Sequence, residues 1–305
     1  MISLLLEIIW TVIVPIAAIV ALGIVIARNF PIDQRSLNVI NLYVFVPALA
    51  FTKFLGSNLD LSQVGLVALF WLLLAVSLWV LAAAANRVFR VPSSRQSVST
   101  MGAMFPNSGN YGLPVIELAF GSFGVAVQSV VIAVHNLLFF SVGTFITGGG
   151  FSRFRRGLSA AARIPVLYAI FAAFLLRNRP ELLPYPLGVA FDTLGQGLVP
   201  VALLTLGAQL GANPLPRPGK EVGIVVVLRL LAAPVVAWGI SILLNLPHPL
   251  AQVLIVSSAF PAAVNTVLLA IEFRRQPSLA SSAVLWTTVV SVVTVTVVIA
   301  LARSM

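Results

Sequence analysis

The chain has 305 residues, of which 60% are hydrophobic and 9% are charged, and its mean hydropathy is +1.07. Soluble domains carry about 25% charged residues, so this chain cannot cover a soluble fold of its size with polar surface. We therefore expect an all-α integral membrane protein. The formal net charge of +10 does not indicate a nucleic-acid partner, because the basic residues lie in short segments between apolar runs, a pattern typical of membrane topology.

The chain contains no cysteine and two histidines. The absence of cysteine excludes disulfides, thiolate metal sites and cysteine nucleophiles. With so few histidines, we expect neither a metal site nor a cofactor.

The apolar residues fall into ten runs of the length that a membrane-spanning helix needs, roughly 17 to 25 residues. The predicted spans lie near residues 5–27, 37–55, 64–86, 97–119, 123–147, 163–178, 187–211, 220–244, 250–272 and 279–302. No basic segment and no small-residue cleavage site accompany the first run, so we interpret it as a retained helix rather than a signal peptide.

The two halves of the chain repeat one another. Five residues recur at a fixed offset of 155: Phe105, Pro106, Asn110, Ile116 and Glu117 correspond to Phe260, Pro261, Asn265, Ile271 and Glu272. We expect one repeat over residues 1–150 and a second over 151–305. Since five spans is an odd number, the second repeat enters the membrane from the opposite side, which predicts two inverted five-helix repeats.

The basic residues between spans predict the orientation. Thirteen lie on one side: Arg28, Arg35, Arg87, Arg90, Arg95, Arg153, Arg155, Arg156, Arg163, Arg217, Lys220, Arg274 and Arg275; four lie on the other: Lys53, Arg177, Arg179 and Arg303. Cytoplasmic loops are enriched in lysine and arginine. We therefore expect a multi-pass protein of the plasma (cytoplasmic) membrane, with both termini outside and the loop from Gly148 to Ala162 inside.

The fourth and ninth runs contain helix-breaking residues in mid-span. The fourth reads Pro-Asn-Ser-Gly-Asn-Tyr-Gly-Leu-Pro from Pro106 to Pro114, and the ninth reads Pro-Ala-Ala-Val-Asn from Pro261 to Asn265. Two prolines, two glycines and two asparagines within nine residues are incompatible with a continuous helix. Broken helices at matching positions of a repeat indicate a transporter's binding site, and their free amino ends favour an anion.

Asparagine suits such a site because its amide can donate to a carboxylate without bringing a charge into the bilayer. We predict substrate contacts from Asn107, Asn110 and Asn265. The alternative is that these residues only cap the broken helices. Five further residues are candidates for the site. Ser108 and Ser258 could donate hydrogen bonds, Gly109 allows close approach of the backbone, and Pro106 and Pro261 break the helices. Small residues also serve helix packing, which is the alternative for the serines and the glycine.

Four ionisable residues are possible accessories. Arg229 lies inside the eighth run, where it either attracts anions or extends towards the membrane surface. Glu117 and Glu272 lie at the ends of the two broken helices. We interpret them as carboxylates at the membrane interface rather than as groups that couple transport to protons. His135 lies in the middle of the fifth run and is favoured as a neutral residue bonded within the helix bundle rather than as a proton relay.

Three stretches resemble the auxin efflux carrier family, the bacterial relatives of the plant PIN auxin exporters, within the superfamily of bile acid and sodium symporters. They are Asn38 to Phe51, Phe105 to Gly121, and Val199 to Gly211 together with the ninth-run motif. The resemblance implies a panel domain of helices 1, 2, 6 and 7, a crossover domain of helices 3–5 and 8–10, a substrate site where helices 4 and 9 cross, and homodimers formed through the panel domains.

The resemblance also implies a secondary transporter of small organic anions, such as auxin-like acids or the dicarboxylates malonate and malate. A sodium-coupled carboxylate or bile-acid-type symporter is the first alternative, and a channel or sensor without turnover is the second. The segments Phe105 to Pro114 and Phe260 to Asn265 contain no Asp, Glu, His, Lys or Arg. From this we expect no sodium requirement and no proton-binding group at the crossing. We also expect no enzymatic activity, because Glu117 and Glu272 lie a membrane thickness apart.

Overall fold

The computed structural model describes residues 2–149, 155, 159, 163–212 and 215–305. This part of the chain is helical and contains no strand, apart from one isolated bridge between two residues. Seven helical segments of the described residues are long and apolar enough to cross a membrane. The all-α membrane class predicted above is thereby confirmed. Most of the predicted inner loop, including Arg153 and Arg156, lies outside the described residues.

The first half of the chain forms these helical segments: α1 (Ile2–Ile8), η1 (Ile9–Ile13), α2 (Val14–Asn29), α3 (Gln34–Ile40), η2 (Asn41–Phe45), α4 (Val46–Leu55), α5 (Leu61–Val88), α6 (Ser93–Met104), η3 (Ser108–Gly112), α7 (Leu113–Leu138), η4 (Phe139–Gly143) and η5 (Phe145–Gly149). Side-chain caps fix two of the starts. The carboxylate of Asp33 accepts from the Arg35 backbone before α3, and Asp60 forms a capping box with Gln63 at α5.

The second half forms α9 (Pro165–Leu176), η6 (Pro180–Leu182), α10 (Tyr185–Gln196), α11 (Leu198–Ala212), α12 (Lys220–Val227), η7 (Leu228–Ala232), α13 (Ala233–Leu243), α14 (His248–Ser258), α15 (Asn265–Glu272) and α16 (Pro277–Arg303). One further interruption lies inside α7, where Gly121 has φ 60° and ψ −152°. Glycine adopts this conformation at little cost, so the chain turns here, between the fourth and fifth predicted spans.

Four prolines each follow a five-residue π-turn. Pro15, Pro47, Pro114 and Pro234 are the second residues of α2, α4, α7 and α13, which directly follow η1, η2, η3 and η7. A proline ring clashes with the carbonyl four residues earlier and cannot donate to it. The wider turn, with bonds such as that from the Val46 N–H to the Asn41 carbonyl, relieves this clash without ending the helix.

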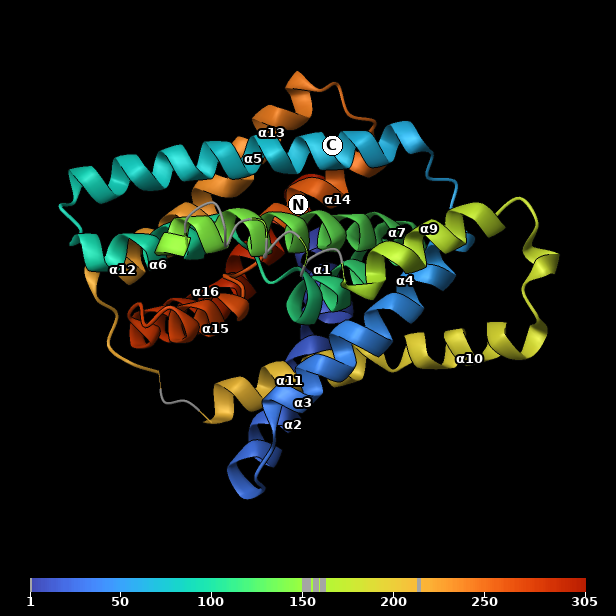
Figure 1. Cartoon of the computed structure of the whole chain (residues 1–305), viewed down its shortest axis with the longest axis horizontal. Helices are drawn as coiled ribbons and strands as arrows, with labels where there is room; N and C mark the ends of the chain where they lie inside the picture. Colours follow the sequence, from blue (N-terminus) through green and yellow to red (C-terminus); the bar gives the residue numbers. More distant parts are fainter. Residues whose placement is uncertain (1, 150–154, 156–158, 160–162, 213–214) are drawn as a thin grey trace.

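The helices pack as two groups that meet along α4 and α7 (Figure 1). In the first group α2 lies against α11, and α4 packs against α9 and α10. In the second group, α5 packs against α6, α7 and α13, and α16 packs against α12, α14 and α15. The largest fully buried side chains of the core include Trp71 and Phe70 on α5 and Phe260 after α14.

Glycines allow the close contact between α2 and α11. A Cβ atom on Gly207 would lie 2.2 Å from the Val20 carbonyl oxygen, and one on Gly23 would lie 2.5 Å from that of Leu204. Any larger residue would force the two backbones apart. Small residues at such contacts are typical of membrane helices, whose association depends on van der Waals packing rather than on expulsion of water.

Candidate functional site

The two broken helices are joined by backbone hydrogen bonds at the point where they cross. After α6 ends, the chain runs extended from Phe105 to Asn107, and after α14 it passes through the unwound residues up to α15. The Asn107 N–H donates to the Pro261 carbonyl at 2.7 Å, and the Ala263 N–H donates to the Phe105 carbonyl at 2.8 Å. These bonds form an antiparallel bridge between Pro106 and Ala262. Backbone groups freed by the breaks therefore satisfy one another, as a membrane interior requires.

Arg229 joins the ends of the two half-helices that lead into the crossing. Its side chain is fully buried and donates to the carbonyls of Ala103 and Met104, both at 3.0 Å, and to the carbonyl of Ser258. These carbonyls end α6 and α14, where the helix dipoles carry partial negative charge. The guanidinium thus neutralises both ends. It neither extends to the membrane surface nor lines the cavity described next.

A cavity of about 110 Å³ lies at the crossing and reaches both groups of helices. Seven predicted residues line it: Pro106, Asn107, Ser108, Gly109, Asn110, His135 and Asn265. The opposite wall comes from α3 and η2. There the Asn110 amide donates to Asn38 Oδ1 at 2.5 Å and accepts from Asn41 Nδ2 at 3.4 Å.

Four residues that line this cavity carry a buried polar atom with no hydrogen-bond partner among the described residues. These atoms are Asn107 Nδ2, His135 Nε2, Asn136 Nδ2 and Asn41 Oδ1, and their residues are at most 8% exposed. Leaving a buried polar group unpaired costs about 1–3 kcal/mol. Two of the four atoms are amide donors, so the cavity is built to receive hydrogen-bond acceptors from a ligand.

The tautomer of His135 adds a third donor. Its Nδ1 lies 2.5 Å from the Ser108 hydroxyl, and its ring packs edge-on against Trp71 with centroids 3.9 Å apart. When Ser108 donates to Nδ1, the Nε2 atom carries the proton and donates into the cavity. The expectation that the crossing lacks a titratable group is therefore wrong. The two broken segments contain no Asp, Glu, His, Lys or Arg, but α7 brings His135 to them.

A second chain of polar contacts holds the first break in place. Gln128 Nε2 donates to the Ser108 carbonyl at 2.9 Å, and its Oε1 accepts from the Ser257 hydroxyl at 2.6 Å. All three residues are at most 5% exposed. The network links the amino end of η3 to α14, so the first-turn N–H groups near Gly109 and Asn110 keep a fixed direction at the cavity.

The remaining predicted residues lie elsewhere. Pro261 supports the crossing through its carbonyl, and the Ser258 hydroxyl donates to Ile255 at 2.6 Å. Glu117 is half-buried on α7 and Glu272 is exposed at the end of α15, and neither lines the cavity. Their positions fit the interfacial interpretation.

Sequence reasoning did not identify three asparagines of the site, Asn38, Asn41 and Asn136. Asn38 and Asn41 are three residues apart in an apolar run, a spacing that places both on one helix face. That spacing was the available signal. Asn136 follows His135 directly, and only the path of α7 brings it to the crossing.

A larger cavity of about 630 Å³ adjoins the first and shares Asn38, Leu42, Val264 and Asn265 with it. It extends to Gln34 and the exposed Arg35 at the start of α3. The crossing is thus continuous with the end of the molecule that carries Arg35. Within the part of the chain that the structure describes, no group of three or more His, Cys, Asp or Glu side chains is placed to hold a metal ion.

Comparison with known proteins identifies the family. The model of the membrane transport protein family matches residues 8–150 and 157–299, which is nearly the whole chain. The chain belongs to the membrane transport protein family. This finding confirms the resemblance to the auxin efflux carriers. The chain is a multi-pass membrane transporter and not an enzyme.

Three relatives of this transporter cover most of its length. An uncharacterized transporter of Methanothermobacter thermautotrophicus is 29% identical over 268 residues, 86% of each chain. A protein of Rhizobium meliloti named "putative malonate transporter" is 26% identical over an alignment of 315 positions, gaps included, which covers 96% of this chain and 95% of that one. An uncharacterized transporter of Methanocaldococcus jannaschii is 24% identical over 277 residues, 86% of this chain and 87% of that one.

Proposed function

We propose that this protein is a secondary transporter of small organic anions, with the substrate carboxylate bound in the cavity at the crossing. The observation that carries the proposal is the set of unpaired buried donors, Asn107 Nδ2, Asn136 Nδ2 and His135 Nε2, beside the amino end of η3. A carboxylate offers acceptors only, and helix amino ends favour negative charge. Among the residues that the structure describes, no carboxylate side chain lines this cavity.

The proposed substrate class is that of short mono- and dicarboxylates, including malonate, malate and auxin-like acids. The Rhizobium meliloti relative is named for malonate transport. A cavity of about 110 Å³ fits one carboxylate and its neighbouring carbons, while the adjoining cavity of about 630 Å³ leaves room for the rest of a longer acid. Arg35 at its far end supplies a positive charge along the entry path.

The proposed mechanism is alternating access, in which a crossover domain of helices 3–5 and 8–10 moves against a panel domain of helices 1, 2, 6 and 7. Asn38 and Asn41 belong to the panel and the other polar residues of the cavity to the crossover, so the substrate binds between moving parts. The bonds from Asn110 to Asn38 and Asn41 are those that such a movement would break. With the larger cavity reaching Arg35, the conformation corresponds to an inward-facing state.

The proposed topology has ten spans in two inverted five-helix repeats, residues 1–150 and 151–305, with both termini outside the plasma membrane. The helix contacts support this topology. α2 of span 1 packs on α11 of span 7, and α4 of span 2 packs on α9 of span 6. A two-fold symmetry that exchanges span 1 with span 6 and span 2 with span 7 would convert one of these pairs into the other. A cysteine introduced at Ser159 into this cysteine-free chain is expected not to be labelled by membrane-impermeant reagents in intact cells. Labelling from outside would contradict the proposed orientation. Homodimers through the panel domain belong to the same proposal, and crosslinking of cysteines placed on α10 tests them.

Transport is proposed not to require sodium. Carbonyl oxygens at the ends of the half-helices are the ligands with which this crossing would bind a cation, and Arg229 already donates to three of them. Flux in proteoliposomes with sodium replaced by potassium is expected to be unchanged. A collapse of flux would instead favour the sodium-coupled symporter.

The central experiment combines binding with flux. Thermal unfolding of the purified protein is measured against a panel of carboxylic acids, since a ligand at about 100 times its Kd stabilises the folded state by about 2.7 kcal/mol. The acid that stabilises is then tested for concentrative uptake into proteoliposomes. Stabilisation together with uptake against a gradient supports a transporter, stabilisation with only downhill flux or none indicates a channel or sensor, and no stabilisation by any acid contradicts the proposed substrate class.

A further inference from the structure

A third cavity, of about 580 Å³, lies away from the crossing between α5, α6, η5 and the turn from α15 to α16. It shares no residue with the two cavities of the substrate site. Its volume falls within the roughly 300–1,000 Å³ of ligand pockets. The polar residues gather near the turn between α5 and α6, and the apolar ones lie along α5 and the helical turns from 142 to 146.

The polar end offers both charge and unpaired hydrogen-bonding atoms. Asn86 is 3% exposed, and its Nδ2 donates to the Thr100 hydroxyl at 3.1 Å. Neither the Oδ1 atom of Asn86 nor the Ser97 hydroxyl has a hydrogen-bond partner among the described residues. Arg275 lines the same cavity, is exposed, and takes part in neither ion pair found among the described residues. α6 begins here at Ser93 without a side-chain cap, so its first N–H groups add positive character.

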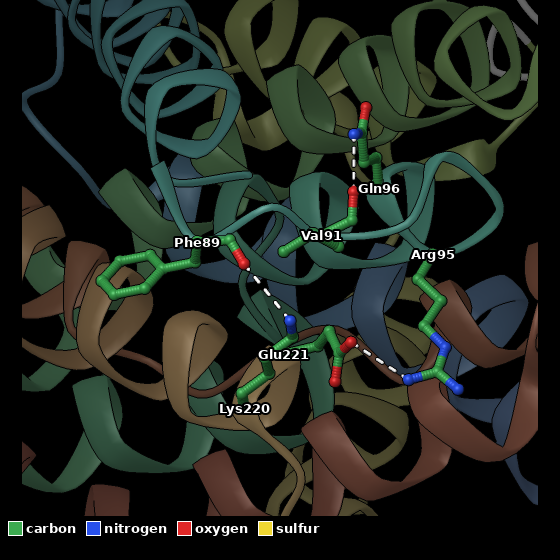
Figure 2. Close-up of polar contacts among 6 residues, drawn as sticks. All are labelled: Phe89, Val91, Arg95, Gln96, Lys220 and Glu221. Atoms are coloured by element: carbon green, nitrogen blue, oxygen red, sulfur yellow. Dashed lines mark hydrogen bonds and ion pairs between the residues drawn. The ribbon is translucent and has the colours of Figure 1, made fainter. Parts of the chain in front are cut away.

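The turn that carries this polar end is held rigidly from its other side. Figure 2 shows Gln96 donating to the Val91 carbonyl at 2.8 Å and Lys220 donating to that of Phe89 at 3.2 Å. It also shows the ion pair between Arg95 and Glu221 at 3.0 Å. The turn is thereby fastened to α12. The polar end of the cavity is therefore preformed.

The apolar walls open sideways to the surroundings of the helices. Trp79 and Phe145 line the cavity, and both are more than half exposed. In a bilayer these rings face acyl chains, and tryptophan prefers the level of the lipid headgroups. Basic pockets between helices at the cytoplasmic side are typical sites for anionic headgroups. Arg87, Arg90 and Arg95 belong to the same α5–α6 corner.

We propose that this cavity binds an anionic glycerophospholipid whose headgroup carries a hydroxyl, such as phosphatidylglycerol. The phosphate lies between Arg275 and the amino end of α6, a headgroup hydroxyl donates to Asn86 Oδ1, and an acyl chain lies along Trp79 and Phe145. The shared chemistry is a phosphate ester, so a soluble phosphate is the competing source. An acyl chain in the apolar part distinguishes the two.

Native mass spectrometry of the full-length protein tests the proposal, with phosphatidylglycerol or phosphatidylcholine added at equal concentration. The expected result is retention of phosphatidylglycerol over phosphatidylcholine. Arg275→Gln is expected to weaken retention about fivefold, the effect of one basic residue near an anionic surface. Arg274→Gln is the matched control, because this neighbouring arginine does not line the cavity, and it is expected to retain the lipid.

A second variant tests the acyl-chain part without changing charge. Ala83 is an exposed residue of α5 on the cavity wall, and Ala83→Phe fills the space beside it. Loss of phosphatidylglycerol in this variant supports the lipid. Equal retention by the parent, Arg275→Gln and Ala83→Phe overturns the proposal. Displacement of the lipid by millimolar glycerol phosphate or inorganic phosphate, with Ala83→Phe unaffected, overturns it in favour of a soluble phosphate.

Discussion

The two broken helices carry the same Phe-Pro step, at Phe105–Pro106 and at Phe260–Pro261, yet they contribute different residues to the crossing. The first break, from Phe105 to Gly112, supplies three polar side chains and one glycine to the cavity, Asn107, Ser108, Asn110 and Gly109, and opens into a π-turn. The second, from Ala259 to Val264, is lined by alanines and a valine, and only Asn265 at the start of α15 adds a polar side chain. Both breaks therefore take part in the backbone bridge at the crossing, while the polar side chains that line the cavity come mainly from the first.

What the two breaks share is Arg229, and removing it is expected to have the largest effect. Arg229→Leu leaves three buried carbonyls without donors, at a cost of about 1–3 kcal/mol for each. We expect a loss of about 3 kcal/mol or more, seen as a large fall in the unfolding temperature in detergent. The exposed Arg28 provides the control, since Arg28→Leu should leave the unfolding temperature unchanged. An unaltered Arg229→Leu protein would mean that the crossing is held by the backbone bridge alone.

The difference between the breaks should appear in binding. Asn107→Ala removes an unpaired donor of the cavity and is expected to weaken carboxylate binding by about 1.5–3 kcal/mol, or roughly 10- to 150-fold. Asn110→Ala and Asn265→Ala are expected to cost about 1 kcal/mol each, because Asn110 is already paired with two asparagines.

Binding in that series is measured by isothermal titration with the acid found in the thermal screen. Asn29→Ala, at an exposed position on α2, controls for the loss of an asparagine elsewhere. Equal losses for Asn107 and Asn265 would show that both breaks bind the ligand alike. Loss of folding without a separate binding defect would favour the capping role for these residues.

Two glycines of the first break test how tightly it packs against the second. A Cβ atom on Gly112 would lie 2.6 Å from Phe260 and 2.9 Å from Gln128 Nε2, whereas one on Gly109 would meet nothing within 4 Å. Gly112→Ala is expected to destabilise the protein by about 1–2 kcal/mol through overpacking. Gly109→Ala, three residues away in the same turn, is expected to be neutral to stability. Similar unfolding temperatures for the two variants would contradict the contact between the breaks.

The smallest effect is expected at His135, which stands beside the first break and has no equivalent beside the second. His135→Gln replaces the donor at Nε2 and is expected to weaken binding by about 1 kcal/mol. The chain's other histidine, His248, is exposed at the start of α14, and His248→Gln is the matched control. Binding that is unchanged in His135→Gln would contradict the role of Nε2 as a donor to the substrate.

The sequence predicts the features that depend on local composition. Apolar runs locate the helical segments, and Pro106 and Pro261 locate both breaks, because their backbone effects act within one turn. Asn107, Asn110 and Asn265 were predictable for the same reason. Features that depend on how distant helices cross were not predictable. No spacing in the sequence brings His135 to Ser108, or Asn38 to Asn110, 72 residues away.

Arg229 illustrates the same limit from the opposite direction. Its depth in an apolar run correctly indicated a buried charge that needs partners. The partners, however, are carbonyls of α6 and α14, and a backbone carbonyl has no sequence signature. The sequence analysis therefore assigned Arg229 to attracting anions or to extending towards the membrane surface, and did not consider backbone carbonyls as its partners.

The π-turns that precede four prolines change the direction in which the side chains after each turn point around the helix axis. One extra residue in a turn delays the helix by about 100°, because an α-helix has 3.6 residues per turn. In the second span, Asn38 and Asn41 face the cavity before the delay, while Ala48, Ala50 and Phe51 are buried among apolar neighbours after it. In a continuous α-helix these later residues would be rotated by about 100° about the helix axis relative to Asn38 and Asn41. The π-turn before Pro47 therefore sets which side of the second half of this span is buried.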